Sequence, residues 1–232
     1  MFLHTFNQNA TEAIMIAGYL DHTLLAPGAT ESDIRKLCRE GLEYHFKSIC
    51  VSGAWVELCA SLLAGSDVLV AAVVGFPHGN SETASKCFEA ETYFTNGARE
   101  LDVVMNVGWM LSGKTTEVRR ELDRIREAAP RAILKLILET CYLSEAQKRL
   151  GCRLALEAGW DYVKTSTGFG TAGATLQDVR LMKSEVGNAM GIKASGGIRE
   201  YETAVKYLQS GATRIGTSSG PEIVKGEVSA GS

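Results

Sequence analysis

Short apolar segments recur along the chain, and a helical pattern follows each of them. The segments are rich in β-branched residues and are spaced by about 20 to 35 residues, the length of one strand and one helix together. They predict eight strands, at residues 19–23, 46–51, 68–76, 100–106, 132–139, 161–166, 191–195 and 214–218. The chain is therefore expected to alternate regularly between strand and helix.

Local signals also place the ends of several helices. Ser144 and Gln147 have the spacing of a capping box, and Thr30 and Asp33 form a weaker version. Glycines are expected just after four helices, at Gly41, Gly97, Gly159 and Gly211. The segment at 7–19, NQNATEAIMIAGY, predicts an additional leading helix.

Eight strand–helix units in 232 residues predict an α/β fold, a single (β/α)8 TIM barrel with an extra N-terminal helix. We expect one domain over 1–232, because no Pro/Ser-rich linker interrupts the chain. An open doubly wound sheet is the alternative. However, the segment after the third strand, VVGFPHGN, is not a GxGxxG loop that opens a helix.

Composition excludes several classes of function. A net charge of −3 gives no broad attraction for nucleic acid or anionic lipid, so neither is expected as a partner. The longest strongly apolar run, 68–76, is far shorter than the roughly 20 residues that span a bilayer. Residues 1–10 lack the basic start and apolar region of a secretory signal.

Cysteine and histidine spacing indicates a reduced protein without a metal. The six cysteines contain no CxxC pair and fall within apolar patterns, so we interpret them as reduced core residues in a cytoplasmic protein. The four histidines show no HxH or HExxH spacing. No metal site and no cofactor are expected.

Charged residues occupy positions inside four consecutive predicted strands. Side chains alternate along a strand, so Asp102, Lys135, Lys164 and Lys193 can all face the barrel interior. Each residue alone is compatible with a structural ion pair at the surface. Together they would bury three cations beside one anion, which is costly unless function requires it.

Lysines held close together suggest a particular chemistry. Two ammonium groups about 4 Å apart repel by roughly 4 kcal/mol at an effective dielectric constant of 20, enough to lower one pKa by about three units. A neutral amine attacks carbonyl groups and forms a Schiff base. We therefore interpret Lys164 as the nucleophile, Lys193 as the cation that lowers its pKa, and Asp102 as a proton shuttle. Lys135 lies earlier in its strand and is expected to support the others.

The last two strands end in segments suited to phosphate. In many barrels the loops after strands seven and eight bind phosphate through backbone N–H groups. Gly196 and Gly197 follow strand seven, and Ser218 and Ser219 follow strand eight. Gly168, after strand six, can widen the same cradle.

Two polar residues end the first strand. Asp21 and Thr23 are candidates for binding substrate hydroxyls, although Asp21 can equally pair with a neighbouring loop.

With these residues placed, the chain resembles the deoxyribose-phosphate aldolases. Seven segments carry the resemblance, between residues 21 and 220: DHTLLAPGAT, VVGFPHG, ELDVVMNVG, LKLILET, DYVKTSTGF, KASGGIR and RIGTSSG. The pair VKTSTGF and KASGGIR, about thirty residues apart, is highly specific. The resemblance implies a metal-free class I aldolase that reversibly cleaves 2-deoxy-D-ribose 5-phosphate to acetaldehyde and D-glyceraldehyde 3-phosphate, in a cytoplasmic dimer or tetramer.

The resemblance also implies roles for individual residues. Lys164 takes the Schiff-base position, and Asp102 and Lys193 take the proton-transfer positions. The phosphate and substrate loops contain Thr167, Gly168, Gly196, Gly197, Gly216, Ser218 and Ser219. In two places the chain departs from the family: Ser52-Gly53 replaces the frequent Asn-Pro after strand two, and no tyrosine follows Tyr207.

Two other readings compete with the aldolase. One is another phosphosugar barrel, an isomerase or a transaldolase-like enzyme. A transaldolase would carry its reactive lysine on strand four, where this chain has Asp102, and an isomerase needs no imine. The other is a barrel that binds a phosphometabolite without catalysis.

Overall fold

The computed structural model describes residues 15–230 of the chain. Eight parallel strands pair in sequence order, and the last pairs with the first to close a barrel. The strands are β1 (Leu20–Leu24), β2 (Ser48–Val51), β3 (Leu69–Val74), β4 (Glu100–Val104), β5 (Ile133–Ile137), β6 (Tyr162–Lys164), β7 (Gly191–Ser195) and β8 (Arg214–Thr217). The predicted (β/α)8 barrel is confirmed, and the doubly wound alternative is wrong.

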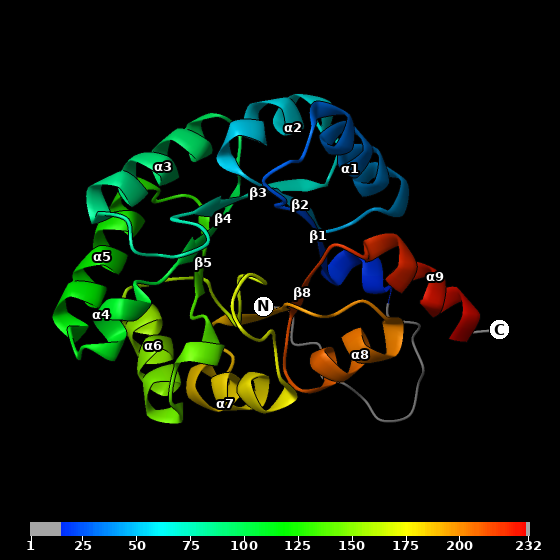
Figure 1. Cartoon of the computed structure of the whole chain (residues 1–232). Coiled ribbons are helices and arrows are strands. Elements are labelled where there is room, and N and C mark those ends of the chain that lie inside the picture. The colour runs from blue at the N-terminus through cyan, green and yellow to red at the C-terminus, as the bar shows by residue number, and fades with distance from the viewer. Residues whose placement is uncertain (1–14, 231–232) are drawn as a thin grey trace.

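The helices form a ring around the strands (Figure 1). They are α1 (Glu31–Tyr44), α2 (Val56–Leu62), α3 (Thr83–Thr95), α4 (Val107–Leu111), α5 (Thr115–Ala128), α6 (Glu145–Glu157), α7 (Leu176–Val186), α8 (Tyr201–Gln209) and α9 (Gly220–Ala230). Three short 3-10 helices are η1 (Ile16–Tyr19), η2 (Gly53–Trp55) and η3 (Thr140–Tyr142). No helix among residues 15–230 combines the length and apolar character needed to cross a bilayer.

The two faces of the barrel strands bury different chemistry. Outward-facing side chains such as Ile49, Val103, Leu136 and Ile215 join the large apolar core beneath the helices. The inward apolar cluster is small and consists of Cys50, Ala71 and Val73, with Leu25 and Phe76 packed against it. Branched aliphatic residues fill the interior of many such barrels. Here most of the inward-facing side chains are polar or charged, so the candidate functional site is sought inside the barrel.

Most of the expected helix ends are confirmed. Thr30 and Ser144 each begin a helix with a complete capping box. Gly97, Gly159 and Gly211 follow α3, α6 and α8 with positive φ angles.

The expected helix end at Gly41 is wrong. The α1 helix continues to Tyr44, and His45 takes the left-handed conformation that ends it. A Cβ at position 41 would lie 3.0 Å from Ile49 Cγ2. This glycine allows the helix to pack closely on β2, and sequence alone does not distinguish that use of glycine from a cap.

Most of the leading helix expected at 7–19 lies outside the described residues. Of that segment, Ile16–Tyr19 form η1.

Candidate active site

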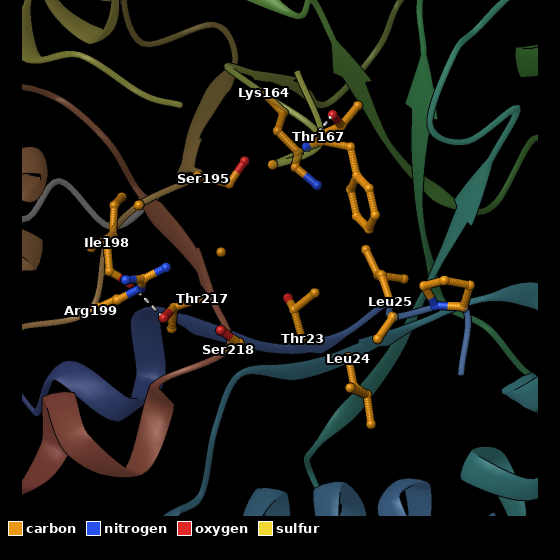
Figure 2. A pocket seen from close by; sticks show the side chains of 17 residues that line it. Thr23, Leu24, Leu25, Lys164, Thr167, Ser195, Ile198, Arg199, Thr217 and Ser218 are labelled. Atoms are coloured by element: carbon orange, nitrogen blue, oxygen red, sulfur yellow. Dashed lines mark hydrogen bonds between the residues drawn. The ribbon is translucent and has the colours of Figure 1, made fainter. Parts of the chain in front are cut away.

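A cavity of about 390 Å³ opens at the carboxyl ends of the strands. Its walls come from the segments that follow β1, β6, β7 and β8. Figure 2 shows the amine of Lys164 pointing into the hollow, with Ser195 beside it and with Arg199, Thr217 and Ser218 across the hollow. This is the end of a barrel at which catalytic groups are expected.

Three lysines meet on one carboxylate below the cavity. Asp102 accepts hydrogen bonds from Lys135 Nζ at 2.8 Å, from Lys164 Nζ at 2.7 Å and from Lys193 Nζ at 2.7 Å. Lys164 and Lys193 bind the same oxygen atom, Oδ2. The four charged residues that the strand pattern brought together are therefore adjacent in space, on the inward face.

The expectation of three cations beside a single anion is wrong. Asp21 lies 2.5 Å from Lys193 Nζ and 3.4 Å from Lys135 Nζ, and Glu100 lies 2.5 Å from Lys135 Nζ. Arg214 donates its Nε–H to Asp21 Oδ1 at 2.8 Å and an Nη2–H to Glu100 Oε2 at 2.8 Å. All of these side chains are buried. Within the described residues, this network thus holds three carboxylates, of Asp21, Glu100 and Asp102, and four cations. The sequence analysis selected neither Glu100 nor Arg214 and did not place Asp21 beside the lysines.

The geometry singles out Lys164 as the cation that loses its proton. Lys164 contacts one carboxylate, Asp102, whereas Lys135, Lys193 and Arg214 each contact two or more. With Lys164 neutral, three carboxylates balance three cations. A buried network without net charge avoids the large penalty of an uncompensated charge.

The pKa shifts agree with this assignment. Burial lowers the pKa of Lys164, with the Lys193 ammonium acting in the same direction and Asp102 opposing both. Asp102 and Asp21 overcome burial and raise the pKa of Lys193. The surrounding lysines hold the pKa of Asp102 well below its ordinary value, against burial. Lys193 thus lowers the pKa of Lys164, as the sequence predicts, but burial is the larger cause.

The phosphate loops line the cavity around a backbone cradle. Gly196 and Gly197 have φ angles of 92° and 84°, which L-residues with side chains rarely adopt. Gly168, Gly216 and Ser218 lie in the same wall, whereas Ser219 does not line it. Ser219 instead donates its backbone N–H to Thr217 Oγ1 at 2.9 Å, just before α9.

Gly216 also makes room for Lys193. A Cβ at this position would lie 2.9 Å from both Lys193 Cε and Ser195 Cβ. The absence of a side chain therefore lets Lys193 extend across the barrel toward Asp102.

The other candidate residues divide between the cavity and the network beneath it. Thr23 and Thr167 line the cavity. Asp21 is fully buried and pairs with Lys193 and Lys135 inside the barrel, so it faces neither the cavity nor a neighbouring loop. Lys135 is likewise buried, as its early position in β5 suggested.

Arg199 is a cavity residue that the sequence analysis did not select. It lines the wall beside Gly197 and Ile198 and is exposed to solvent. Its guanidinium adds a cation to a wall otherwise rich in glycines and hydroxyls, and such a group binds phosphate in a forked geometry. The signal was present, since Arg199 is the last residue of KASGGIR.

The departure at Ser52-Gly53 has a packing explanation. A Cβ on Gly53 would lie 2.0 Å from the Tyr93 ring. The glycine therefore accommodates Tyr93 of α3 against η2. Neither Ser52 nor Gly53 lines the main cavity.

Comparison with known proteins agrees with this geometry. Residues 15–226 match the model of the DeoC/LacD family aldolases. A deoxyribose-phosphate aldolase of Brevibacillus brevis is 52% identical over 92% of this chain and 97% of its own length. One from Carboxydothermus hydrogenoformans is 50% identical over 92% of this chain and 96% of its own length.

The chain belongs to the DeoC/LacD aldolase family.

A solved structure of a family relative has the same fold. The deoxyribose phosphate aldolase of Aeropyrum pernix superposes with a TM-score of 0.86 at 36% identity, covering 93% of this chain and 92% of that one. Within the described part of this family member, no group of three His, Cys, Asp or Glu side chains is arranged to hold a metal ion.

Proposed function

We propose that this family member reversibly cleaves 2-deoxy-D-ribose 5-phosphate to acetaldehyde and D-glyceraldehyde 3-phosphate, as a carbon–carbon lyase. Two relatives that are 52% and 50% identical to this chain over 92% of its length are named deoxyribose-phosphate aldolases, and this supports the reaction. One observation supports the mechanism: of the four cations on the inward face of the barrel strands, Lys164 both lines the cavity and contacts a single carboxylate.

The reaction begins with Lys164 as nucleophile. Its neutral amine attacks C1 of the open-chain sugar aldehyde and forms a carbinolamine. Lys193, held protonated by Asp21 and Asp102, supplies a proton directly or through water as the hydroxyl leaves. The resulting iminium lies beside the Asp102 carboxylate, which stabilises its positive charge.

Carbon–carbon cleavage follows from the iminium. Asp102, acting as the proton shuttle directly or through water, accepts the proton of the 3-hydroxyl. The C2–C3 bond then breaks, and its electron pair moves into the iminium to give an enamine. This step releases D-glyceraldehyde 3-phosphate. Protonation of C2 and hydrolysis then release acetaldehyde and restore the Lys164 amine.

The phosphate anchors the substrate so that C1 reaches Lys164. Gly168, Gly196, Gly197 and Gly216 offer close backbone approach, Thr23, Thr167 and Ser218 offer hydroxyls, and Arg199 offers positive charge. Ser219 does not line the cavity and supports this wall indirectly, by donating its backbone N–H to Thr217 Oγ1. Asp21 and Lys135 support the site from beneath rather than by touching the sugar.

The wider setting of the enzyme is also part of the proposal. We expect one domain over 1–232, working in the cytoplasm without cofactor, nucleic acid or membrane partner. All six cysteines are free, in keeping with a reducing compartment. A homo-oligomer, dimer or tetramer, is expected, and the Aeropyrum pernix relative is described as tetrameric.

Trapping with borohydride tests the reaction class and the nucleophile together. The protein is incubated with acetaldehyde, reduced, digested and analysed by mass spectrometry. We expect an ethyl adduct on Lys164. An isomerase or a phosphate-binding barrel without catalysis would give no adduct, and an adduct confined to another lysine would overturn the assignment. A coupled assay for acetaldehyde released from deoxyribose phosphate tests turnover.

A further inference from the structure

Glu100 and Arg214 form an ion pair beneath the lysines and do not line the cavity. Arg214 Nη2 lies 2.8 Å from Glu100 Oε2, and Arg214 Nη1 lies 3.0 Å from Glu100 Oε1. Glu100 is fully buried, and Arg214 is 3% exposed. Neither residue can touch a substrate bound beside Lys164.

Both residues are joined to the catalytic lysines through shared partners. Glu100 contacts Lys135 at 2.5 Å, and Lys135 contacts Asp102 at 2.8 Å. Arg214 contacts Asp21, which binds Lys193 at 2.5 Å. Glu100 is therefore two ion pairs away from Asp102, the carboxylate that holds Lys164, and Arg214 is three ion pairs away from it.

The other strands add no further charge to this part of the interior. On the inward face, β2 contributes Ser48 and Cys50, β3 contributes Ala71 and Val73, and β6 adds Tyr162, over whose ring Arg214 lies at 5.9 Å. Burial raises the pKa of the Cys50 thiol, so it stays neutral. The charge balance is thus set by Asp21, Glu100 and Asp102 against Lys135, Lys164, Lys193 and Arg214.

We infer that Glu100 and Arg214 are positioning residues that set the protonation state of Lys164 by fixing the net charge of this network. Removing Arg214 leaves three carboxylates facing two other cations, and a protonated Lys164 then restores neutrality. Removing the Glu100 carboxylate leaves a positive excess, which favours the neutral amine still more. The two changes therefore act in opposite directions, and removing both restores the balance.

The test is the pH profile of four proteins: wild type, Arg214→Met, Glu100→Gln and the double variant. The readouts are the acidic limb of kcat/KM and the rate of reductive trapping of acetaldehyde at Lys164. One unit charge at roughly 10 Å and an effective dielectric constant of about 20 shifts a pKa by about one unit. We expect the midpoint to rise by about one pH unit in Arg214→Met, to fall in Glu100→Gln and to return near the wild-type value in the double variant.

An Arg214→Lys variant separates charge from packing. It retains the cation but loses the forked contacts with Glu100, so its midpoint is expected to match wild type even if its stability falls. The inference would be overturned if the two single variants and the double variant had the same midpoint of the acidic limb. It would also be overturned if the midpoint of the double variant were shifted further than that of either single variant. If Arg214→Met does not fold, the comparison of Glu100→Gln with the double variant decides: equal midpoints count against the inference.

The inference rests on the proposed function, and the two fail in different ways. Wild-type protein that gives no adduct at Lys164 would refute the proposed reaction. If wild-type protein is trapped at Lys164 but the variants have the same pH profile as wild type, only the role of Glu100 and Arg214 would be refuted.

Discussion

Replacement of Asp102 by asparagine is the most demanding test of the buried network. The amide keeps the shape of the side chain but removes the negative charge that three lysines share at 2.7 to 2.8 Å. Two carboxylates then face Lys135, Lys193 and Arg214. Breaking a buried pair by removing one partner costs about 3 to 5 kcal/mol, a large part of the roughly 5 to 15 kcal/mol by which domains are stable.

Urea unfolding at pH 7, followed by tryptophan fluorescence, measures this loss. The matched control is Asp123→Asn, which removes a partly exposed carboxylate 2.9 Å from Arg119 on the surface of α5. A surface pair of this kind contributes less than about 1 kcal/mol. We therefore expect Asp102→Asn to lose several times more free energy of unfolding than the control, together with most of its turnover.

The stability lost in Asp102→Asn is also expected to depend on pH, in a direction that follows from the pKa of Asp102. Because the folded-state pKa of Asp102 is lowered, its contribution is present above the ordinary carboxyl pKa of about 3.9 and disappears as the pH falls through the folded-state value. The difference in the free energy of unfolding between wild type and Asp102→Asn is expected to be largest at pH 7 and to become smaller below about pH 4. Equal stability of Asp102→Asn and Asp123→Asn at pH 7 would refute the network as described.

Three further variants test separate parts of the site. Lys164→Ala is expected to abolish turnover and trapping while circular dichroism stays unchanged, and a near-normal rate would exclude Lys164 as nucleophile. Lys193→Leu removes a cation that lowers the Lys164 pKa, so the acidic limb of kcat/KM should move upward; an unmoved limb would leave burial as the whole cause. Gly216→Ala places a Cβ 2.9 Å from Lys193 Cε and should cost about 1 to 3 kcal/mol of stability and lower kcat, whereas unchanged kinetics would show that Lys193 has room to shift.

The sequence determined the barrel and most of the reactive residues. Strand identity depends on local patterns of apolar and β-branched residues, and eight such patterns at the spacing of a strand–helix unit leave few folds. Alternation along β4 to β7 placed Asp102, Lys135, Lys164 and Lys193 on a common face, and strand pairing then aligns Asp102 with Lys135 and Lys164 with Lys193. These inferences need only neighbours along the chain or on the next strand.

Tertiary structure decided the charge balance and the limits of the cavity. Arg214 binds Glu100, 114 residues away in sequence, and Asp21, 193 residues away. These contacts cross the barrel interior, and they depend on strand register and on how far long side chains extend. Neither the strand register nor the extension of these side chains can be predicted from local sequence patterns. For that reason the sequence was enough to propose Lys164 as the nucleophile, but only the closed barrel showed which charges surround it and that burial contributes most to the lowering of its pKa.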